Sequence, residues 1–408
     1  MRSGTDAMRA KLVFIVLYLI WLVSYVDRAV ITYAAPVIAT EFALNHQQIG
    51  WTLGAFYLGY AVMQIPAGWL ADRFGARVMV LAGVGFWSFF TLLTGLSGGF
   101  AALLAVRLLF GLGEGLYPPA SVKMIRESFT REKAPLAASL LMSSSYLGLV
   151  FTPPLLLPLL GVVGWRTCFE ILAGLGVTMA VVFALTTRPS TGQDAAPQEE
   201  KPEGWSQIIR RRDVWRLMLV WFVASLVNKG LDGWMPTFLL RAHHVAIKSA
   251  GALLAAPNLA ATLGSLLGGW IVMRFFSRRA DALLSLILLG VALSLAGMAT
   301  AGSINIVILF ESIAYFFKGM ILAVITAIVT VRLPRTRLAS GNGFINFGGQ
   351  MAGFVALPMM GVVLDATGSY AMTFALLMVA VTCGLALNLG SGRLGLSPED
   401  QSGRMKTA

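Results

Sequence analysis

Charged residues that interrupt long apolar stretches are the chemically most informative feature of this sequence. A charge in the middle of a membrane-spanning helix costs at least ~2.5–3.5 kcal/mol, and it persists only when it is paired or faces water. Such residues bind ions or carry protons. They are Asp27, Arg28, Arg107 and Glu114 in the first half of the chain, and Lys229, Asp232, Glu311 and Lys318 in the second. Within the spans of each half, the two acidic and two basic residues therefore sum to zero charge.

The first apolar stretch places Tyr25 and Arg28 on one helical face, with Asp27 beside them. If Asp27 and Arg28 form a static pair, they only fix helix packing. If they form a switch, burial favours the neutral acid while the guanidinium favours the carboxylate, and protonation of Asp27 releases Arg28 to bind an anion. Arginine suits that task because its planar fork matches a carboxylate with two hydrogen bonds.

The fourth apolar stretch repeats this chemistry. Arg107, Gly111 and Glu114 are spaced i, i+4 and i+7, so they form one stripe, and the glycine permits close helix approach. Glu114 is either a proton carrier, which we favour, or the static partner of Arg107. Pro118 and Pro119 are predicted to break the helix just beyond it.

Uncharged polar stripes occur in two further stretches. Each either holds helices together or faces a wet cavity. Their members are Tyr57, Tyr60 and Gln64 in the first half, and Asn342, Asn346 and Gln350 in the second.

The charged residues of the second half are spaced as internal salt bridges. Lys229 and Asp232 are three residues apart, and Glu311 and Lys318 are two helical turns apart. Each pair is first interpreted as a static bridge. A free Lys229 would instead be a second anion-binding group facing Arg28, its equivalent in the repeat described below.

Composition indicates the elements that position these residues. The chain of 408 residues is 57% hydrophobic and 12% charged, whereas soluble domains are about 25% charged. Apolar stretches long enough to cross a bilayer alternate with short polar turns. We predict an all-α membrane protein with twelve transmembrane helices, over residues 12–35, 49–70, 77–97, 100–124, 135–160, 166–187, 214–240, 249–273, 281–301, 304–331, 338–363 and 369–392.

The chain also contains a tandem duplication. The segment 68–77 (GWLADRFGAR) is echoed 201 residues later by the segment 269–278 (GWIVMRFFSR). A Pro-, Glu- and Gln-rich stretch separates the copies, which predicts a six-helix half over residues 1–187, a linker over 188–213 and a second six-helix half over 214–408. Parallel repeats in so apolar a chain indicate a transporter whose halves rock about a central site.

The basic residues predict the orientation. Of the 31 Lys and Arg residues, 4 lie within the spans and 24 on the side of the termini, so only Arg166, Arg241 and Lys248 fall on the opposite side. Both termini are therefore expected in the cytoplasm, with the chain in a cell inner membrane. The formal net charge of +12 reflects this topology, and no nucleic-acid partner is expected.

These residues resemble the major facilitator superfamily and, within it, the anion:cation symporters of sugar acids and other organic anions. The resemblance rests on the 68–77 segment and on Arg107-x3-Gly111-x-Gly113. The finer match is Tyr25-x-Asp27-Arg28, Tyr60-x3-Gln64-Ile-Pro-x-Gly68, Glu114-x3-Pro118, Trp234-Met-Pro-Thr-Phe238 and Asn346. Two departures are Ser128-Phe129-Thr130, where relatives usually have Trp-Phe-Pro, and the charges Lys229 and Asp232 in the seventh span.

The resemblance implies a major facilitator fold and proton-coupled uptake of an organic anion. The acids matching the family's coupling residues are Asp27 and Glu114. The residues expected at the substrate are Tyr25, Arg28, Tyr57, Tyr60, Gln64, Lys229, Trp234, Asn342, Asn346 and Gln350. Asp72 would lock an outward-open state by pairing across the halves, and Arg73, Arg77 and Arg107 are expected to share this conformational role.

We therefore predict a symporter that imports a small carboxylate with protons by alternating access and functions as a monomer. The alternative is an exporter of amphipathic compounds by proton antiport, but the fifth span lacks the paired glycines usual in drug antiporters, and a buried Arg28 suits anions. No enzyme, metal site or cofactor is expected, because the histidines His46, His243 and His244 all lie near one surface, outside any catalytic or zinc-binding arrangement.

Overall fold

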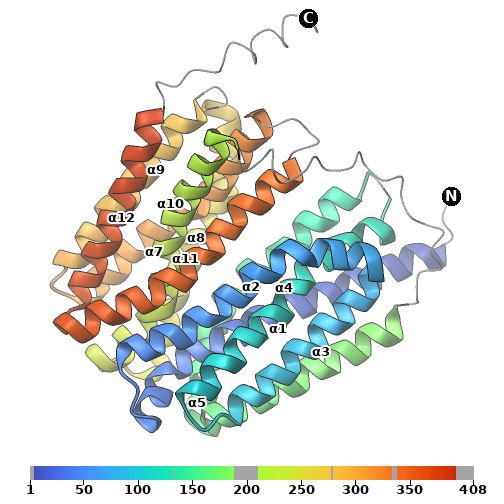
Figure 1. Ribbon diagram of the computed structural model, residues 1–408, viewed down its shortest axis with the longest axis horizontal. Coiled ribbons are helices and arrows are strands. Elements are labelled where there is room, and N and C mark those ends of the chain that lie inside the picture. The colour runs from blue at the N-terminus through green and yellow to red at the C-terminus, as the bar shows by residue number, and fades with distance from the viewer. Residues whose placement is uncertain (1–3, 131, 188–209, 277–278, 333–337, 392–408) are drawn as a thin grey trace, which may run out of the picture.

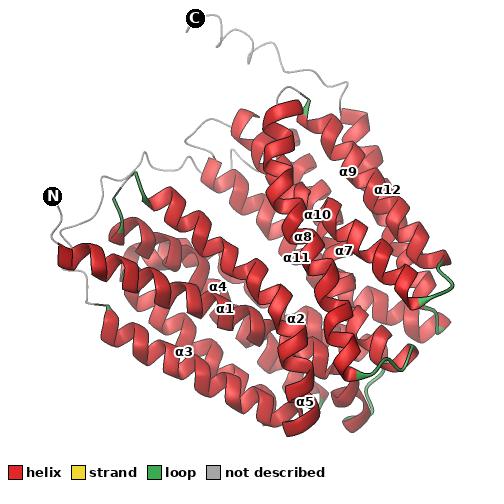
Figure 2. Ribbon diagram, turned by 180° about the vertical axis from the view of Figure 1, so that it is seen from behind, coloured by secondary structure: helices red, strands yellow, loops and turns green. Residues whose placement is uncertain are grey.

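The computed structural model describes residues 4–130, 132–187, 210–276, 279–332 and 338–391, and all regular structure in these ranges is helical. The elements are α1 (Gly4–Glu41), α2 (His46–Phe74), α3 (Ala76–Gly95), α4 (Phe100–Ser128), α5 (Ala134–Thr186), α7 (Arg212–Thr237), the short π-helix η1 (Phe238–Ala242), α8 (Ile247–Phe275), α9 (Ala280–Thr300), α10 (Ile304–Arg332), α11 (Leu338–Thr367) and α12 (Tyr370–Ser391). Figure 2 draws these helices in red and the described turns between them in green.

The 53-residue α5 is two membrane-crossing helices joined by a bend. A straight helix of that length would extend ~80 Å, far beyond the ~30 Å hydrocarbon thickness of a bilayer. Gly164 supplies the bend, because its φ of 77° and ψ of 167° lie outside the helical region and are open to glycine at little cost. The predicted spans 135–160 and 166–187 lie on either side of it.

The helix surfaces agree with a membrane protein. Ten helical segments of the described chain, α5 counted once, are long and apolar enough to cross a bilayer. Large apolar side chains face outward; for example Val162 is 83% exposed, Leu266 71% and Leu155 69%. Such surfaces are stable against lipid but not against water. The prediction of an all-helical membrane protein is confirmed.

The helices form two bundles (Figure 1), coloured blue to green for the first half and yellow-green to red for the second. In the first bundle α1 packs on α5, and α4 packs on α2 and α3; in the second, α10 packs on α8 and α9, and α11 packs on α7. The bundles meet where α2 contacts α11, α5 contacts α8 and α1 contacts α7. Both views show α2 and α11 side by side. The predicted linker lies outside the described residues except for residues 210–213.

The two bundles are joined most tightly at one end. We call this the closed end; it carries the turns after α1 and after η1. The other, the terminal end, is where α1 begins and α12 ends (Figure 1). One hydrophobic core lies wholly in the first bundle, whereas the other contains the core of the second bundle together with first-bundle residues near the closed end, such as Ile38, Ile49 and Leu157.

The predicted break after Glu114 is wrong. The helix α4 continues through Pro118 and Pro119 to Ser128. Prolines are tolerated inside membrane helices where neighbouring groups satisfy the backbone atoms that they free. Just beyond the prolines, the Ser121 hydroxyl donates to the Pro118 carbonyl at 2.9 Å and accepts from the indole of Trp21 at 3.1 Å, which ties this turn to α1.

Candidate functional site

Arg28 and Glu114 form the central ion pair of the first bundle. Arg28 Nε and Nη2 both donate to Glu114 Oε2, at 3.0 and 2.6 Å, and the Ser24 hydroxyl donates to Glu114 Oε1 at 3.1 Å. The Glu114 side chain is fully buried and that of Arg28 is 13% exposed. The sequence suggested two possible static pairs, Arg28 with Asp27 and Arg107 with Glu114. Both are wrong, because Arg28 of α1 pairs instead with Glu114 of α4.

Aromatic rings surround the Arg28 guanidinium. Its Cζ atom lies 4.7 Å from the ring centroid of Tyr25, 4.9 Å from that of Phe56 and 5.0 Å from that of Tyr60. Ring faces attract a cation while excluding water. The rings therefore hold Arg28 in place whether or not it carries an anionic partner, and the predicted grouping of Tyr25, Arg28 and Tyr60 is found.

Asp27 points away from Arg28 into the first bundle. It is 1% exposed, and its Oδ2 accepts a hydrogen bond from Thr91 of α3 at 2.5 Å. Its Oδ1 has no hydrogen-bond partner. Neighbouring residues on a helix project about 100° apart, which is why the adjacent Asp27 and Arg28 contact different helices.

Arg107 is a buried cation whose donors are largely unused. It is 1% exposed, and its Nε and Nη1 atoms have no hydrogen-bond partner. Its Cζ lies 4.4 Å from the ring centroid of Phe110 and 5.5 Å from that of Phe56, and it interacts electrostatically with Asp27 and Glu114. Unpaired guanidinium N–H groups at such depth are costly, so an anion or water that accepted from them would be strongly favoured.

A cavity between the two bundles joins these residues. It is lined from the first bundle by Arg28, Ile31, Thr32, Leu53, Phe56, Tyr57 and Arg107, and from the second by Asp232, Gly233 and Leu357. Two guanidinium groups therefore face a space that both halves of the chain enclose. Such a space, with positive charge and aromatic walls, suits a small anion.

The predicted salt bridges of the second bundle are not formed in the described part of the chain. The Lys229 ammonium instead lies 4.6 Å from the ring centroid of Tyr57, across the interface between the bundles. Lys318 lies 4.2 Å from the ring centroid of Tyr315, whose hydroxyl donates to Asp232. These salt bridges are absent because aromatic ring faces attract the two lysines and a tyrosine hydroxyl bonds to Asp232. Spacing along a single helix does not reveal such partners. Lys229 therefore lies against Tyr57, one of the residues that line the cavity.

The polar stripes behave differently from one another. Asn346 of α11 donates to Gln64 of α2 at 2.9 Å, so these two predicted substrate residues pair across the bundles. Gln350 is half-buried, and its Oε1 has no hydrogen-bond partner. Asn342 is exposed, one turn nearer the terminal end. Of the two stripes, Gln64 and Asn346 thus form a direct contact between the bundles.

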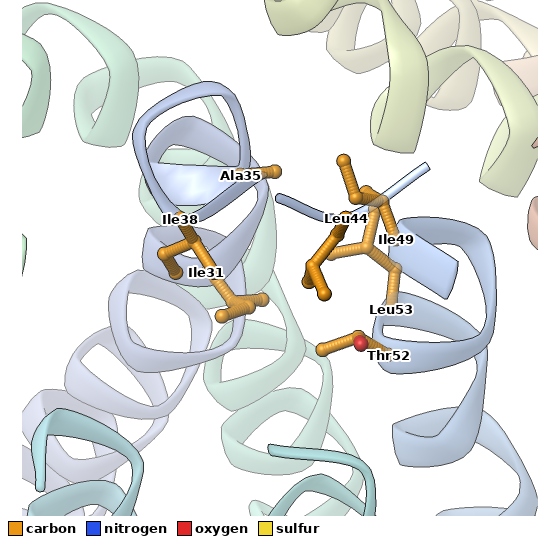
Figure 3. Close-up of a pocket in the computed structure, with 7 residues that line it drawn as sticks. All are labelled: Ile31, Ala35, Ile38, Leu44, Ile49, Thr52 and Leu53. Carbon is orange, nitrogen blue, oxygen red and sulfur yellow. The ribbon is translucent and has the colours of Figure 1, made fainter. Parts of the chain in front are cut away.

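Trp234 belongs to the closed end rather than to the cavity wall. It is 1% exposed, its indole donates to the Leu357 carbonyl of α11 at 3.1 Å, and its ring lies 5.9 Å from that of His46. Beside it, Ile31 and Leu53 line both the central cavity and an apolar pocket between α1 and α2 (Figure 3). We call the buried side chains of Ile31, Ile38, Leu53, Trp234 and Leu357 the apolar layer, because they belong to one hydrophobic cluster between the cavity and the closed end.

A carboxylate fastens the closed end. Asp365, in the last turn of α11, accepts from the backbone N–H groups of His46 and Gln47 at 3.0 and 2.9 Å and contacts the His46 ring at 2.7 Å. These N–H groups begin α2, where the helix dipole favours a negative charge. Arg241 of η1 adds hydrogen bonds to the Pro36 carbonyl and the Thr40 hydroxyl. Neither contact was predicted.

The loop residues assigned to gating lie at the terminal end of the first bundle. Asp72 forms an ion pair of 2.7 Å with Lys123 of α4, within its own half. Arg77 donates to the carbonyls of Ala184 and Thr187 at 3.0 and 3.2 Å, and Arg73 lies over the Trp69 ring at 5.3 Å. The pairing of Asp72 across the halves, expected for an outward-open state, is not the arrangement here.

Three contributors were missed by sequence reasoning. Thr91 gives no signal, because a threonine in an apolar span is ordinary. Phe56 could have been found, because it lies one turn before Tyr60 on the same face of α2. Tyr315 is likewise one turn before Lys318 in α10, but its bond to Asp232 of α7 depends on how the two helices pack.

Comparison with known proteins places this arrangement in a family. Residues 17–275 match the family model described as Major Facilitator Superfamily. The chain is 30% identical over 399 residues, covering 91% of it and 92% of the relative, to the probable sulfoacetate transporter SauU of Cupriavidus necator. It is 26% identical over 390 residues, covering 87% and 85%, to the probable galactarate/D-glucarate transporter GudP of Bacillus subtilis.

A solved structure shows the same fold. The crystal structure of a bacterial homolog to the human lysosomal transporter Spinster, in an inward-facing and occupied conformation, superposes with a TM-score of 0.82 at 21% identity, covering 93% of this chain and 96% of that one. The predicted major facilitator fold is confirmed by this match and by the family model. The relatives are named transporters, as expected of a chain that is not an enzyme.

Proposed function

The chain is a transporter of the major facilitator superfamily, and on that premise we propose that it imports a small organic anion together with protons. The observation that carries the proposal is the buried pair of Arg28 and Glu114 beside the unsatisfied donors of Arg107. A carboxylate or sulfonate of a substrate is the natural acceptor for both guanidinium groups. The relatives are named as probable transporters of sulfoacetate and of galactarate or D-glucarate, which are anions of this kind.

Competition for Arg28 couples the anion to the proton in this proposal. Glu114 and a substrate carboxylate have the same chemistry, so they compete for the donors at Nε and Nη2. A proton on Glu114 removes its charge, so the attraction between opposite charges is lost and only hydrogen bonds from the guanidinium to a neutral carboxyl remain. The anion then gains Arg28 only when Glu114 is neutral, and deprotonation of Glu114 expels the anion. Asp27, held by Thr91 near Arg107, is proposed as a second acid in the same cycle.

The conformation fits the release step of an importer. The apolar layer and Asp365 seal the closed end, while Arg28 is already occupied by Glu114. If the terminal end is cytoplasmic, as the distribution of Lys and Arg predicts, this is an inward-facing carrier in which Glu114 holds Arg28. We place it accordingly in a cell inner membrane, with both termini in the cytoplasm. The cavity lies within one chain, which supports a functional monomer.

Uptake into proteoliposomes tests the proposal. Sulfoacetate and D-glucarate are offered outside at acidic pH, with the interior at neutral pH and the membrane potential clamped at zero. Accumulation above the outside concentration, abolished by a protonophore, is expected. Accumulation only when the pH gradient is reversed would identify the antiport alternative, and uptake that equilibrates regardless of the gradient would overturn proton coupling.

A further inference from the structure

The second bundle contains a group of buried ionisable side chains that are separate from the Arg28–Glu114 pair. We call it the α7–α10 acid cluster; its members are Asp232 of α7 and Glu311, Tyr315 and Lys318 of α10. The Tyr315 hydroxyl donates to Asp232 Oδ1, and the Lys318 ammonium lies 4.2 Å from the Tyr315 ring centroid. Asp232 also lines the central cavity, so the cluster borders the proposed substrate space.

Glu311 is the unexplained member of this cluster. It is 2% exposed, and its Oε2 atom has no hydrogen-bond partner. In the described part of the chain it forms no ion pair, although Asp232 and Lys318 are close enough to interact with it electrostatically. An ionised carboxylate in such a place would carry its full desolvation cost without a compensating donor, whereas a neutral carboxyl leaves at most a hydrogen bond unmade, ~1–3 kcal/mol. The geometry therefore accommodates a protonated Glu311.

None of the described charged groups around Glu311 bonds to its carboxylate, so a bound proton is the simplest way to neutralise its charge. The groups that act on it are Asp232 from α7, Lys318 and Tyr315 from α10, and Tyr33 from α1, which interacts with both acids. The charged residues of α8, α9 and α11, the other helices packed on α10, lie in the first or last turns of their helices: Lys248, Arg274, Asp281 and Asp365. Among these residues, Lys318 is the only cation that interacts electrostatically with Glu311. Its ammonium lies over the Tyr315 ring and does not bond to the acid.

Glu311 lies on the closed-end side of the cavity, which determines from which side of the membrane a proton can reach it. It lies about two turns from the start of α10, and Asp232 lies about as near the end of α7, so both are on the closed-end side of the cavity. In this conformation the Asp365 lock and the apolar layer cover that side. When the closed end opens, the cluster is the first buried acid group that solvent reaches from there.

We propose that Glu311 is a proton-binding site of the second bundle, loaded from the closed-end side and acting in addition to the carboxyls of the first bundle. This deepens the proposed function and rests on it. Loss of the proton leaves two negative charges, Glu311 and Asp232, beside Tyr315 and attracts Lys318 away from the ring. The proton thereby links the charge at the cavity wall to the packing of α7 on α10.

The stoichiometry of transport tests the site. Glu311→Gln keeps the shape of a neutral carboxyl but cannot exchange a proton, so each cycle should carry about one proton fewer per anion. With the potential clamped at zero and a gradient of one pH unit, the limiting accumulation of D-glucarate should fall about tenfold, since each proton contributes one factor of ten per unit. Counterflow of D-glucarate between equal pH values should persist. Glu132→Gln, on an exposed turn, is the matched control and should behave as wild type.

The outcomes separate this inference from the proposed function. If the wild type accumulates no anion against its gradient, the proposed function fails. If the wild type accumulates D-glucarate and Glu311→Gln does so equally, the function stands and the proton site is refuted. A variant that loses both accumulation and counterflow while folded would also refute it, because Glu311 would then be needed for conformational change itself.

An infrared measurement on the reconstituted protein covers the case in which Glu311→Gln does not fold. A protonated carboxyl in an apolar setting gives a carbonyl stretch distinct from that of a carboxylate. The wild type should show such a band at neutral pH, and Glu311→Asp, which keeps the acid in a shifted position, should move it. A wild-type spectrum without the band, or a band unmoved in Glu311→Asp, overturns the proposal.

Discussion

Glu114→Gln is the substitution that most directly examines competition for Arg28. Glutamine keeps an acceptor within reach of Arg28 and an amide that can bond to Ser24, so the cavity keeps its shape while the charge is lost. The two bonds at 3.0 and 2.6 Å become bonds from the guanidinium to a neutral amide oxygen, so what is lost is the attraction between opposite charges. That attraction is on the order of 2–4 kcal/mol at an effective dielectric constant of about 20 or somewhat higher. Anion affinity should then rise at least about thirtyfold.

In Glu114→Gln the affinity for the anion should rise while accumulation driven by the pH gradient falls. Calorimetric titration of the purified protein with D-glucarate should show wild-type affinity falling as pH rises, because the ionised Glu114 recaptures Arg28. In Glu114→Gln the affinity should be higher and nearly independent of pH. Accumulation driven by the pH gradient should be lost, whereas counterflow should persist, because exchange of bound anion does not require Glu114 to lose a proton.

Two results would refute this reasoning. Unchanged affinity in Glu114→Gln would mean that Glu114 and the anion do not compete for Arg28. Accumulation equal to that of the wild type would make the pair a structural feature of α1 and α4, and the proton would have to be carried by Asp27 or Glu311. Thermal unfolding of the variant in detergent serves as the control for folding.

The remaining predictions concern the other cations and the closed end. Arg28→Lys keeps the charge but not the fork, so anion uptake should fall at least tenfold at normal membrane abundance; wild-type uptake would exclude bidentate binding. Lys229→Gln should raise the apparent KM about tenfold more for D-glucarate, a dianion, than for D-gluconate, a monoanion of the same chain length, and equal changes would return Lys229 to a packing role. Asp365→Asn removes the negative charge at the start of α2, which should weaken this contact by ~0.3–1 kcal/mol and make a cysteine placed at Ile38 more reactive toward a thiol reagent added on the closed-end side; unaltered labelling would show that the lock lies elsewhere.

The sequence by itself determined the membrane fold and the chemistry of the site. Apolar stretches of bilayer length can only be helices, because lipid offers no partner for backbone N–H and C=O groups. The cost of a buried charge then singled out Arg28, Arg107 and Glu114 without any structure. The repeat at an interval of 201 residues likewise revealed that Lys229 occupies the position equivalent to Arg28.

The pairing among these residues was decided only by tertiary structure. Spacing along one helix can suggest partners within that helix, which is why Asp27 was expected beside Arg28 and Asp232 beside Lys229. The structure joins Arg28 to Glu114 and Asp27 to Thr91, because each side chain leaves its helix toward a different neighbour. Helix rotation and crossing set these directions, and they depend on the packing of all the helices together.

The closed end likewise depends on tertiary structure. Asp365 is an ordinary acid at a helix end in the sequence, and only the approach of α11 to α2 places it on the first N–H groups of α2. Which end of the cavity is sealed is a property of one state of a rocking molecule. A sequence encodes every state of that cycle at once, whereas the contacts of Asp365 and the occupancy of Arg28 by Glu114 belong to a single state.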